Sequence, residues 1–412
     1  MATTPDRSLP LANHDTLRVA LKRTLERPLT SYHIVLGVSA LLLALGLLMV
    51  LSASSVSSLR EYGDSYAIFL RQALWVAIGV PLGWATSRLP QRMIRWLSWP
   101  ALVTASVLIA LTYIPGLGVL VNGNRNWLSV GGGIQIQPSE LAKLALVLWL
   151  ADIYARKGTL LREWRHLIVP MVPVSVFVVA LVIGQGDLGT ALVLLGIIVG
   201  MLWIVGAPAR LFSATFLVIG VAAFAIATTE QERVSRLTGF LDPLAEYGDG
   251  GWQASHGFFA LATGGLWGKG IGASSQKWGG LPESHTDYIF AIIGEEFGLF
   301  GTLMVLMLFA ALAYAGIRVA SRTTDRFVRF AAAGIVVWLL GQALINIGMV
   351  LGLLPVIGIP LPLISYGGSA LVPTLVALGL LMSFARSEPG AQAALRARRR
   401  NARTSASAAT GR

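Results

Sequence analysis

The sequence lacks cysteine and is poor in charged residues. With no cysteine among 412 residues, a disulfide framework, a thiolate metal site and a cysteine nucleophile are all excluded. Only 13% of the residues are charged and 55% are hydrophobic, which is too little charge to cover one or two water-soluble domains. The composition therefore predicts that lipid, and not water, surrounds most of this chain.

Long apolar runs are abundant instead. A helix needs about 20 apolar residues to cross a hydrocarbon core of about 30 Å, and such runs recur along the sequence. They predict an all-α polytopic membrane protein with about ten transmembrane helices. The predicted spans are residues 34–53, 68–87, 97–114, 139–155, 167–184, 189–206, 212–228, 297–317, 330–351 and 369–385.

The formal charge of +12 is explained by membrane orientation. An even number of spans puts both termini on one side. If that side is cytoplasmic, most of the 32 Lys and Arg residues fall on cytoplasmic segments, as the positive-inside rule requires. The basic residues therefore need no nucleic acid as a partner, and both termini are predicted to be cytoplasmic.

The spans divide the chain into three parts. Residues 1–30 form a basic cytoplasmic segment, residues 31–388 the membrane domain, and residues 389–412 a basic disordered cytoplasmic tail. Leu17, Leu21 and Leu25 share one helical face in the first part, which fits either a helix on the membrane surface or a fraying arm. A large extracytoplasmic loop, residues 229–296, joins helices seven and eight, and loops of this length usually carry function.

The first outward cluster contains Arg125 and Trp127 and leads into Gln137-Pro-Ser-Glu140-Leu-Ala-Lys143. Glu140 and Lys143 are three residues apart and share one face of a helix. Ionisable groups at membrane depth are candidates for a site, although a mutual ion pair that closes the bundle is an alternative. Trp127 fits either a substrate contact or an interfacial anchor.

The second cluster is Gln185-Gly-Asp187-Leu-Gly-Thr190, between spans five and six. Asp187 lies near the start of the next helix, where a carboxylate can cap exposed backbone amides. A substrate contact is the other interpretation, and the two are compatible.

The third cluster is rich in acids, glycines and cations. It begins with Asp242, Glu246 and Asp249 and continues past Gln253 to Lys269 and Lys277. Glycines let the backbone approach a ligand closely, the cations can bind phosphate, and the acids can supply a general base.

The same loop ends with Leu281-Pro-Glu283-Ser-His285-Thr-Asp287-Tyr288. Glu283, His285 and Asp287 fit a divalent-metal site or, more simply, a hydrogen-bonded turn. The helix that follows contains Glu295 and Glu296, and a buried carboxylate there needs a partner.

The fourth cluster, residues 354–369, contains three prolines and a glycine pair, together with Ser365 and Gly367. These residues forbid a continuous helix. Irregular backbone at membrane depth is tolerated only against protein or a wet cavity, so this segment is predicted to line the site.

Five motifs occur in order between Leu36 and Pro389. They are Asn-Gly-x-x-x-Trp-Leu, Gln-Pro-Ser-Glu-x-x-Lys, Gln-x-Asp-Leu-Gly-Thr, Leu-Pro-Glu-x-His-Thr-Asp-Tyr-Ile-Phe and Pro-Leu-Pro-Leu-Ile-Ser-Tyr-Gly-Gly-Ser. Together they strongly resemble the SEDS family (shape, elongation, division and sporulation). Residues 291–296 and 384–389 are most similar to its division members, and residues 252–253 and 276–278 to actinobacterial ones.

The resemblance implies polymerisation of lipid II, with inversion at the anomeric centre and undecaprenyl pyrophosphate as the leaving group. It implies that lipid II and the lipid-linked glycan are bound by a multi-pass protein of the bacterial plasma membrane, at the division septum. It also implies a class B penicillin-binding protein and other divisome membrane proteins as partners. No cofactor is predicted, and a requirement for a divalent cation is left open.

The family's essential aspartate aligns by spacing with Glu246, where this sequence departs from the pattern, and Asp249 and Asp242 are the alternates. A glutamate reaches one methylene further, and misplacement by about 1 Å can cost about 10²-fold in rate. The residues predicted to bind substrate are Arg125, Trp127, Gln137, Glu140, Lys143, Asp187, Gln253, Lys269, Lys277, Glu283, His285, Asp287, Ser365 and Gly367.

Two alternative functions belong to other classes. A lipid II flippase also needs buried charge pairs and broken helices, but its polar residues should reach both faces. A catalytically weak scaffold that activates a class B penicillin-binding protein is the second alternative, kept open by the glutamate at position 246.

Overall fold

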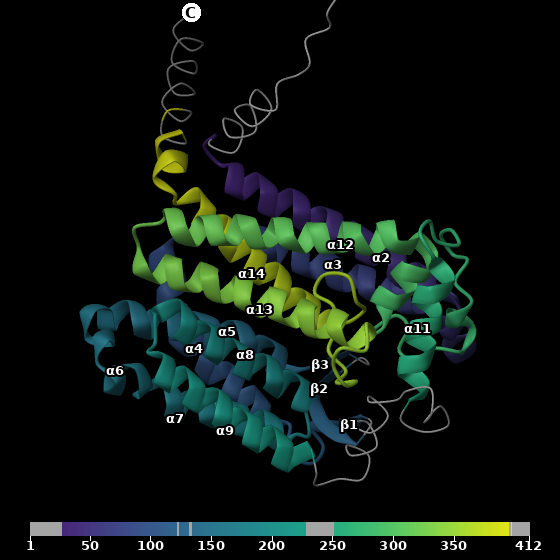
Figure 1. The fold of residues 1–412 in the computed structure, drawn as a ribbon, viewed down its shortest axis with the longest axis horizontal. Coiled ribbons are helices and arrows are strands. Elements are labelled where there is room, and N and C mark those ends of the chain that lie inside the picture. The colour runs from purple at the N-terminus through teal and green to yellow at the C-terminus, as the bar shows by residue number, and fades with distance from the viewer. Residues whose placement is uncertain (1–26, 122, 132–133, 228–250, 395–396, 398–412) are drawn as a thin grey trace, which may run out of the picture.

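The computed structural model describes residues 27–121, 123–131, 134–227, 251–394 and 397. Within these ranges long helices run along the longest axis of the molecule (Figure 1). The longer helices are α2 (Thr30–Tyr62), α3 (Ala67–Thr86), α4 (Gln91–Leu111), α5 (Pro138–Lys157), α7 (Met171–Gly184), α8 (Leu188–Val205), α9 (Ala209–Ala227), α11 (Trp252–Gly264), α12 (Ile289–Arg322), α13 (Arg326–Val350) and α14 (Gly368–Arg386). Shorter ones are η1 (Gly158–Arg162), α6 (Trp164–Ile168) and η2 (Gln276–Trp278).

Every predicted span lies on a helix, although α2 ends at Tyr62 and not at residue 53, and α12 begins at Ile289 and not at residue 297. Among the described residues, eight helical segments are long and apolar enough to cross a membrane. They are α2, α3, α4, the segment Trp164–Gly184 formed by α6 and α7, α8, α12, α13 and α14. The prediction of a helical polytopic membrane protein is thus confirmed, whereas ten spans and cytoplasmic termini stay predictions.

Helix α5 lies in the middle of the bundle, against α4, α8, α13 and α14. Its large side chains Trp149 and Tyr154 are fully buried. It also carries Glu140, Lys143 and Asp152, all of them buried. A helix with this many ionisable groups is tolerated at membrane depth because other helices, and not lipid, surround it.

Helices α3 and α14 pack through glycines. A Cβ atom on Gly83 would lie 2.7 Å from the carbonyl oxygen of Leu375, and one on Gly379 would lie 2.1 Å from the carbonyl oxygen of Gly83. Small residues permit such close approach of backbones in membrane bundles, where dispersion contacts replace the hydrophobic effect. This contact holds the middle of α14 beside α3.

A small antiparallel sheet was not predicted. Its strands are β1 (Gly118–Val121), β2 (Asn124–Gly131) and β3 (Ile134–Ile136), in the order β1-β2-β3. Val119 pairs with Trp127, and Leu128 pairs with Ile136. Figure 1 places the sheet, α11 and the irregular segment before α14 at the same end of the bundle, which we call the motif end.

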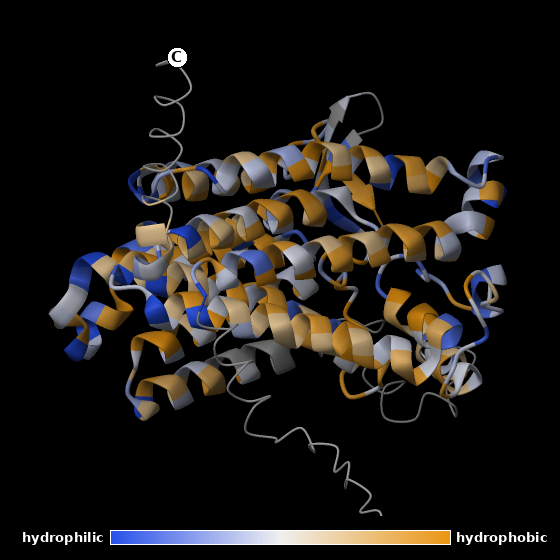
Figure 2. Ribbon diagram, turned by 90° about the horizontal axis from the view of Figure 1, so that it is seen from above, coloured by the Kyte–Doolittle hydropathy of each residue, from blue (hydrophilic) through white to orange (hydrophobic). Residues whose placement is uncertain are grey.

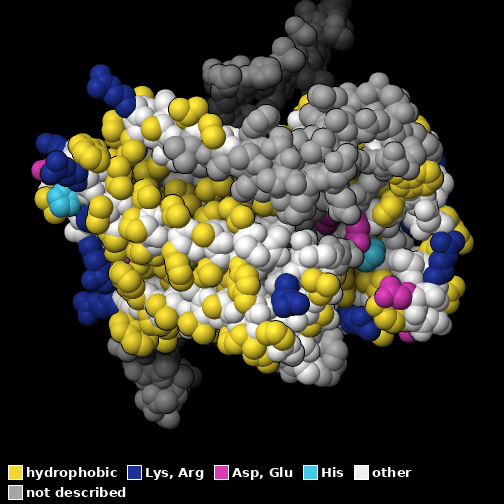
Figure 3. Space-filling model, turned by 90° about the horizontal axis from the view of Figure 1, so that it is seen from below, with side chains coloured by type: hydrophobic (Ala, Val, Ile, Leu, Met, Phe, Trp, Pro, Cys, Tyr) yellow, Lys and Arg dark blue, Asp and Glu magenta, His cyan; other side chains and the backbone are white. Residues whose placement is uncertain are grey.

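Polar and apolar residues are distributed as expected for a membrane-spanning bundle. Apolar residues predominate along the helices in Figure 2, with polar ones mostly near the ends. Figure 3 shows apolar side chains over the middle of one face and most charged side chains near its two ends. The long axis of the bundle is therefore the direction in which it crosses the membrane.

The end opposite the motif end is held by a buried carboxylate. Asp152 accepts hydrogen bonds from Nε of Arg95 over 2.5 Å and from Nε of Arg156 over 2.8 Å, and it is fully buried. Two cations around one acid leave this end net positive.

Of the predicted disordered tail, residues 389–394 are helical, and all but one of the remaining residues lie outside the described ranges.

Candidate active site

Asp187 connects three segments at the motif end. One carboxylate oxygen accepts from the backbone N–H of Thr190 over 2.9 Å, which caps α8. The other accepts from the side-chain amide of Gln137 over 2.6 Å and from that of Asn126 over 3.2 Å. The predicted cap is confirmed, and the same carboxylate fixes the sheet against the start of α5.

Glu140 and Lys143 form a buried ion pair. Their charged atoms are 2.7 Å apart, and side-chain exposure is 1% for Lys143 and 4% for Glu140. The ammonium also donates to Oε1 of Gln342 over 2.9 Å, and the Trp338 indole donates to the same oxygen over 3.0 Å. The pair therefore joins α5 to α13, as the bundle-closing interpretation required.

The two proline-containing motifs lie against each other. The Ser365 hydroxyl donates to the carbonyl of Thr286 over 2.6 Å, and the Tyr366 N–H donates to the carbonyl of His285 over 2.9 Å. The Asn346 side chain on α13 donates to the carbonyls of Asp287 and Ile359, both over 2.7 Å. Residues 283–288 and 357–367 thus form one wall.

Two spans support this wall from behind. Gln72 on α3 accepts from the N–H of Gly367 over 3.2 Å and donates to the carbonyl of Ser365 over 3.3 Å. Gly46 on α2 contacts Leu363, because a Cβ there would lie 2.4 Å from the Leu363 carbonyl oxygen. Leu363 has a φ of 66°, a left-handed conformation that is unusual for a leucine and marks a locally strained turn.

Glu295 organises the segment before α12. Its carboxylate accepts from the Lys269 ammonium over 2.8 Å, the Ser274 hydroxyl over 2.6 Å and the Ser275 hydroxyl over 2.7 Å. The Ser275 N–H donates to it over 3.0 Å. A fully buried carboxylate with this many donors fixes the course of the chain through residues 269–276.

Glu296 lies next to it and reaches α2. The Ser52 hydroxyl donates to Oε1 of Glu296 over 2.6 Å, and the Lys277 ammonium lies 3.6 Å from the same oxygen. Lys277 also donates to the carbonyl of Gly272 over 2.6 Å. Lys269 and Lys277 are therefore both paired with buried carboxylates of α12 in this structure.

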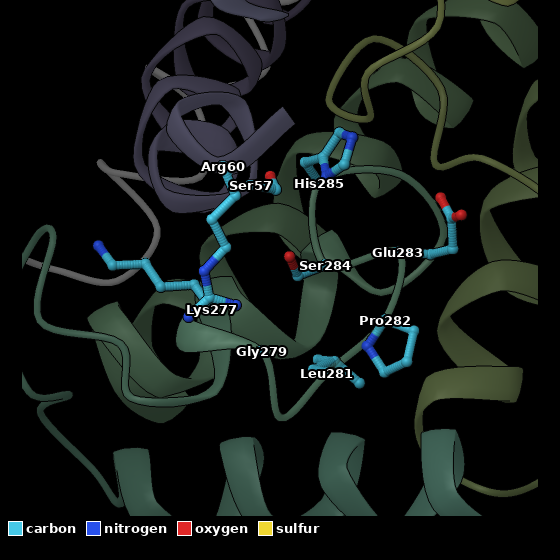
Figure 4. A pocket seen from close by; sticks show the side chains of 9 residues that line it. All are labelled: Ser57, Arg60, Lys277, Gly279, Leu281, Pro282, Glu283, Ser284 and His285. Carbon is cyan, nitrogen blue, oxygen red and sulfur yellow. The ribbon is translucent and has the colours of Figure 1, made fainter. Parts of the chain in front are cut away.

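A pocket of about 250 Å³ lies between the end of α2 and the loop before α12. Figure 4 shows Arg60 reaching from α2 towards Gly279, with Ser284 and His285 on the opposite wall. Arg60 donates to the carbonyl of Trp278 over 2.9 Å and forms no ion pair with another described residue. The lining residues are Ser57, Arg60, Lys277, Gly279, Leu281, Pro282, Glu283, Ser284 and His285.

His285 and Glu283 give this pocket two unusual features. Burial lowers the pKa of His285, while the charges of Glu283 and Glu61 oppose that shift. The ring is therefore neutral near pH 7, and its buried Nδ1 has no hydrogen-bond partner among the described residues. Glu283 has a φ of 53°, and strain of this kind gathers at functional sites.

Asp287 is half-buried at the start of α12, where it precedes the N-cap residue Tyr288. Its Oδ2 would be 3.3 Å from a Cβ on Gly358, so the carboxylate lies beside the irregular segment before α14. Glu283 is exposed and accepts from the Thr286 hydroxyl over 2.5 Å. Of the two acids in this loop, Asp287 is the one held within the wall.

Apart from the buried Glu140–Lys143 pair, the predicted site residues that the structure describes fall into two groups at the motif end. Asp187 and Gln137 belong to the first group, and Arg125 and Trp127 reach it through strand β2, with the Arg125 N–H donating to the carbonyl of Gln185 over 3.2 Å. The second group is Gln253, Lys269, Lys277, Glu283, His285, Asp287, Ser365 and Gly367. The Gln137 N–H links the groups by donating to Ser369 over 3.0 Å.

The sequence interpretation missed four polar residues on helices, Arg60, Gln72, Gln342 and Asn346. Each is embedded in an apolar run or at its end, and a polar residue within a span is the signal that could have identified it.

The predicted base Glu246 and its alternates Asp249 and Asp242 lie outside the described residues. Within the described part of the chain, no three His, Asp or Glu side chains gather closely enough to hold a metal ion.

The bundle and its polar end define a multi-pass membrane protein with a candidate active site at one end. The chain belongs to the FtsW/RodA/SpoVE family of cell cycle proteins, whose model matches residues 32–389. This confirms the resemblance drawn from the motifs.

Individual relatives agree with this assignment. A probable peptidoglycan glycosyltransferase FtsW of Mycobacterium tuberculosis is 43% identical over 375 residues, covering 91% of this chain and 71% of the relative. Stage V sporulation protein E of Bacillus subtilis is 38% identical over 353 residues, covering 85% and 95%. The mycobacterial match agrees with the actinobacterial features of the motifs.

Solved structures share the fold. A chain from a peptidoglycan synthase complex that coordinates polymerization and crosslinking superposes with a TM-score of 0.71 at 28% identity, covering 86% of this chain and 97% of that one. Rod shape determining protein RodA of Thermus thermophilus gives a TM-score of 0.64 at 27% identity, covering 86% and 96%.

Proposed function

We propose that this protein is a peptidoglycan glycosyltransferase that polymerises lipid II during septal cell-wall synthesis. The observation that carries the proposal is the meeting of distant motifs at one end of the bundle. Gln137 contacts both Asp187 and Ser369, and Ser365 contacts Thr286. Relatives that are 43% identical to this chain are named probable peptidoglycan glycosyltransferases.

The reaction makes two demands on the protein. A base takes the proton from the attacking sugar hydroxyl, and cationic or amide donors stabilise the departing undecaprenyl pyrophosphate. The growing chain on its lipid pyrophosphate is the donor, a second lipid II supplies the hydroxyl, and the anomeric centre inverts. Both substrates are anchored in the membrane, which suits a site at the end of a helical bundle.

For the pyrophosphate, we assign Arg60 as the principal cation among the described residues. Lys143 is buried against Glu140, and Lys269 contacts Glu295 over 2.8 Å. Arg60 instead lines an open pocket beside the Ser284 hydroxyl, and an arginine fork suits phosphate oxygens. Lys269 and Lys277, which were predicted to bind substrate, are then assigned a different role, which is to position the loop that faces Arg60.

Two carboxylates, Asp287 and Glu246, are the main candidates for the general base. Spacing in the sequence favours Glu246. Among the carboxylates that the structure describes, Asp287 fits best, because its carboxylate is half-buried in the wall of the motif end, beside the irregular segment before α14. Asp287 is half-buried on a backbone that Asn346 anchors, so we place it first and Glu246 second, with Asp249 and Asp242 behind them.

The activity is tested with purified protein in vesicles that receive lipid II from outside. We expect glycan strands on a gel and release of undecaprenyl pyrophosphate in equal proportion to the bonds formed. Transfer of lipid II between leaflets without strands would support the flippase. Strands that form only through an added polymerising partner would support the scaffold, and either result would overturn our assignment.

The base is tested by Asp287→Asn, Glu246→Gln, Asp249→Asn and Asp242→Asn, with Asp64→Asn in the exposed turn after α2 as the control. Loss of a positioned general base costs about 10²–10⁴-fold in rate, and we expect this loss for Asp287→Asn and near-normal rates for the control. Normal turnover in Asp287→Asn together with inactive Glu246→Gln would move the role to Glu246.

We also propose a class B penicillin-binding protein as the partner and the division septum as the location. The structural neighbour from a synthase complex supports the partner, and the FtsW relatives support the location. Copurification of the two membrane proteins and fluorescence imaging of the tagged chain at the septum test these assignments. A divalent cation is tested in the vesicle assay by adding a chelator and then Mg²⁺ or Mn²⁺.

A further inference from the structure

Four large apolar side chains are exposed where the chain enters α12. Exposure is 57% for Leu266, 79% for Trp267, 63% for Ile271 and 55% for Phe300. We call these residues the apolar rim. The Trp267 and Phe300 rings are in contact, with centroids 4.8 Å apart. Exposed aromatic and aliphatic side chains of this size mark a surface that meets something other than water.

The backbone fixes the direction in which the rim points. The Leu299 N–H donates to the carbonyl of Gly265 over 2.9 Å, and the Lys269 N–H donates to the carbonyl of Glu295 over 3.0 Å. Gly268 approaches Gly298 so closely that a Cβ on Gly268 would lie 2.7 Å from the Gly298 nitrogen. The polar side of the segment therefore faces the buried acids of α12, and its apolar side faces outwards.

The depth of the rim follows from a break in α12. Gly298 has φ 66° and ψ −160°, which are not helical values, so the regular membrane-crossing part of α12 starts just after it. Phe300 is in the first turn of that part, and Leu303 and Met307 continue the exposed apolar face. The Trp267 ring contacts the Phe300 ring and so lies level with the start of the span, where aromatic side chains anchor membrane proteins.

We infer that the apolar rim lies in the lipid interface at the motif end, with Trp267 and Ile271 at the boundary between headgroups and acyl chains. The partner is the phospholipid leaflet itself, because the rim continues the face of α12 that meets lipid. This goes beyond the proposed activity. It places Lys269 and the serines around Glu295 at headgroup level, beside the site for lipid-linked substrates.

The chain has no cysteine, so single cysteines can be labelled without background. We would label Trp267→Cys and Ile271→Cys with an environment-sensitive fluorophore and reconstitute each full-length variant in phosphatidylcholine–phosphatidylglycerol vesicles. Leu303→Cys on the lipid-facing side of α12 and Asp64→Cys in the exposed turn after α2 are the matched controls. Quenching is measured with nitroxide-labelled lipid and, separately, with iodide.

We expect both rim labels to be quenched by nitroxide lipid to within about twofold of the Leu303 label, and by iodide at least severalfold less than the Asp64 label. Iodide quenching as strong as at Asp64 would overturn the inference. Shielding from both reagents would also overturn it, in favour of contact with a second protein chain. Because activity is not the readout, these outcomes are independent of whether the protein polymerises lipid II.

Discussion

The side-chain amide of Asn346 donates to the backbone carbonyl of Asp287 over 2.7 Å. It also donates to the carbonyl of Ile359 over 2.7 Å. One fully buried side chain of α13 therefore holds both segments of the wall at the motif end. The position of the Asp287 carboxylate depends on a residue that no substrate needs to touch.

Asn346→Leu should reduce turnover more than substrate binding. The change removes both N–H donors, and leaving the buried Ile359 carbonyl unsatisfied costs about 1–3 kcal/mol. The half-buried Asp287 segment loses its anchor as well. A displacement of about 1 Å at a reacting group costs about 10²-fold in rate, so we expect kcat to fall by about that factor with a small change in KM. Leu344→Ala, on the exposed side of the same helix, is the control, and an unchanged kcat in Asn346→Leu would contradict the positioning role.

Lys143→Met should destabilise the bundle strongly. It leaves the Glu140 carboxylate buried without its cation, which costs about 3–5 kcal/mol. The double change Glu140→Met with Lys143→Met should restore most of the thermal stability, because apolar residues of similar size can replace a buried pair. The free energies of unfolding of the wild type, Lys143→Met, Glu140→Met and the double variant give the coupling energy. A double variant that is stable but inactive would show that the pair also acts on substrate.

Asp187→Ala should loosen the sheet as well as α8. Loss of the cap costs about 0.5–2 kcal/mol, and Gln137 loses its acceptor at the start of α5. Asp187→Asn keeps an oxygen for capping and should retain most of the stability. We expect faster proteolysis within residues 118–136 in Asp187→Ala only. Equally fast cleavage of both variants would show that the oxygen facing the sheet, and not the cap, is what matters, since Asp187→Asn keeps the cap.

Stability should fall in mild acid because of His285. Burial lowers the pKa of this imidazole in the folded protein, whereas the unfolded chain takes up a proton near the ordinary pKa of about 6.5. The stabilising contribution is therefore present above pH 6.5 and is lost as the pH falls through the lower folded-state pKa. The melting temperature of the wild type should drop more than that of His285→Gln between pH 7 and pH 5. Parallel curves would contradict this.

Apolar runs predicted the helices well because each span must satisfy its own backbone in lipid. The central helix α5 was found through its apolar run, residues 139–155, even though it carries several ionisable groups. The cap at Asp187 followed from local spacing. These features are local in sequence, so the residues concerned were sufficient to predict them.

Features that depend on contacts between distant residues were not predicted. The strand partners Val119 and Trp127 are separated by a turn whose sequence also suits a polar loop. Asn346 and Gln342 stand in an apolar run, and only the fold shows that they meet residues 287 and 360. The break at Gly298 depends on the close approach of Gly268. The sequence around either glycine does not predict this contact with the other.

The carboxylate that organises residues 269–276 comes after them in the chain. Lys269 and the two serines leave the ribosome before Glu295, so at first they lack the carboxylate that they contact in the folded protein. Their final arrangement must wait until α12 has entered the bilayer and brought Glu295 to its place. The surface of this segment is therefore completed by membrane insertion of the following helix, and a chain interrupted before that helix cannot form it.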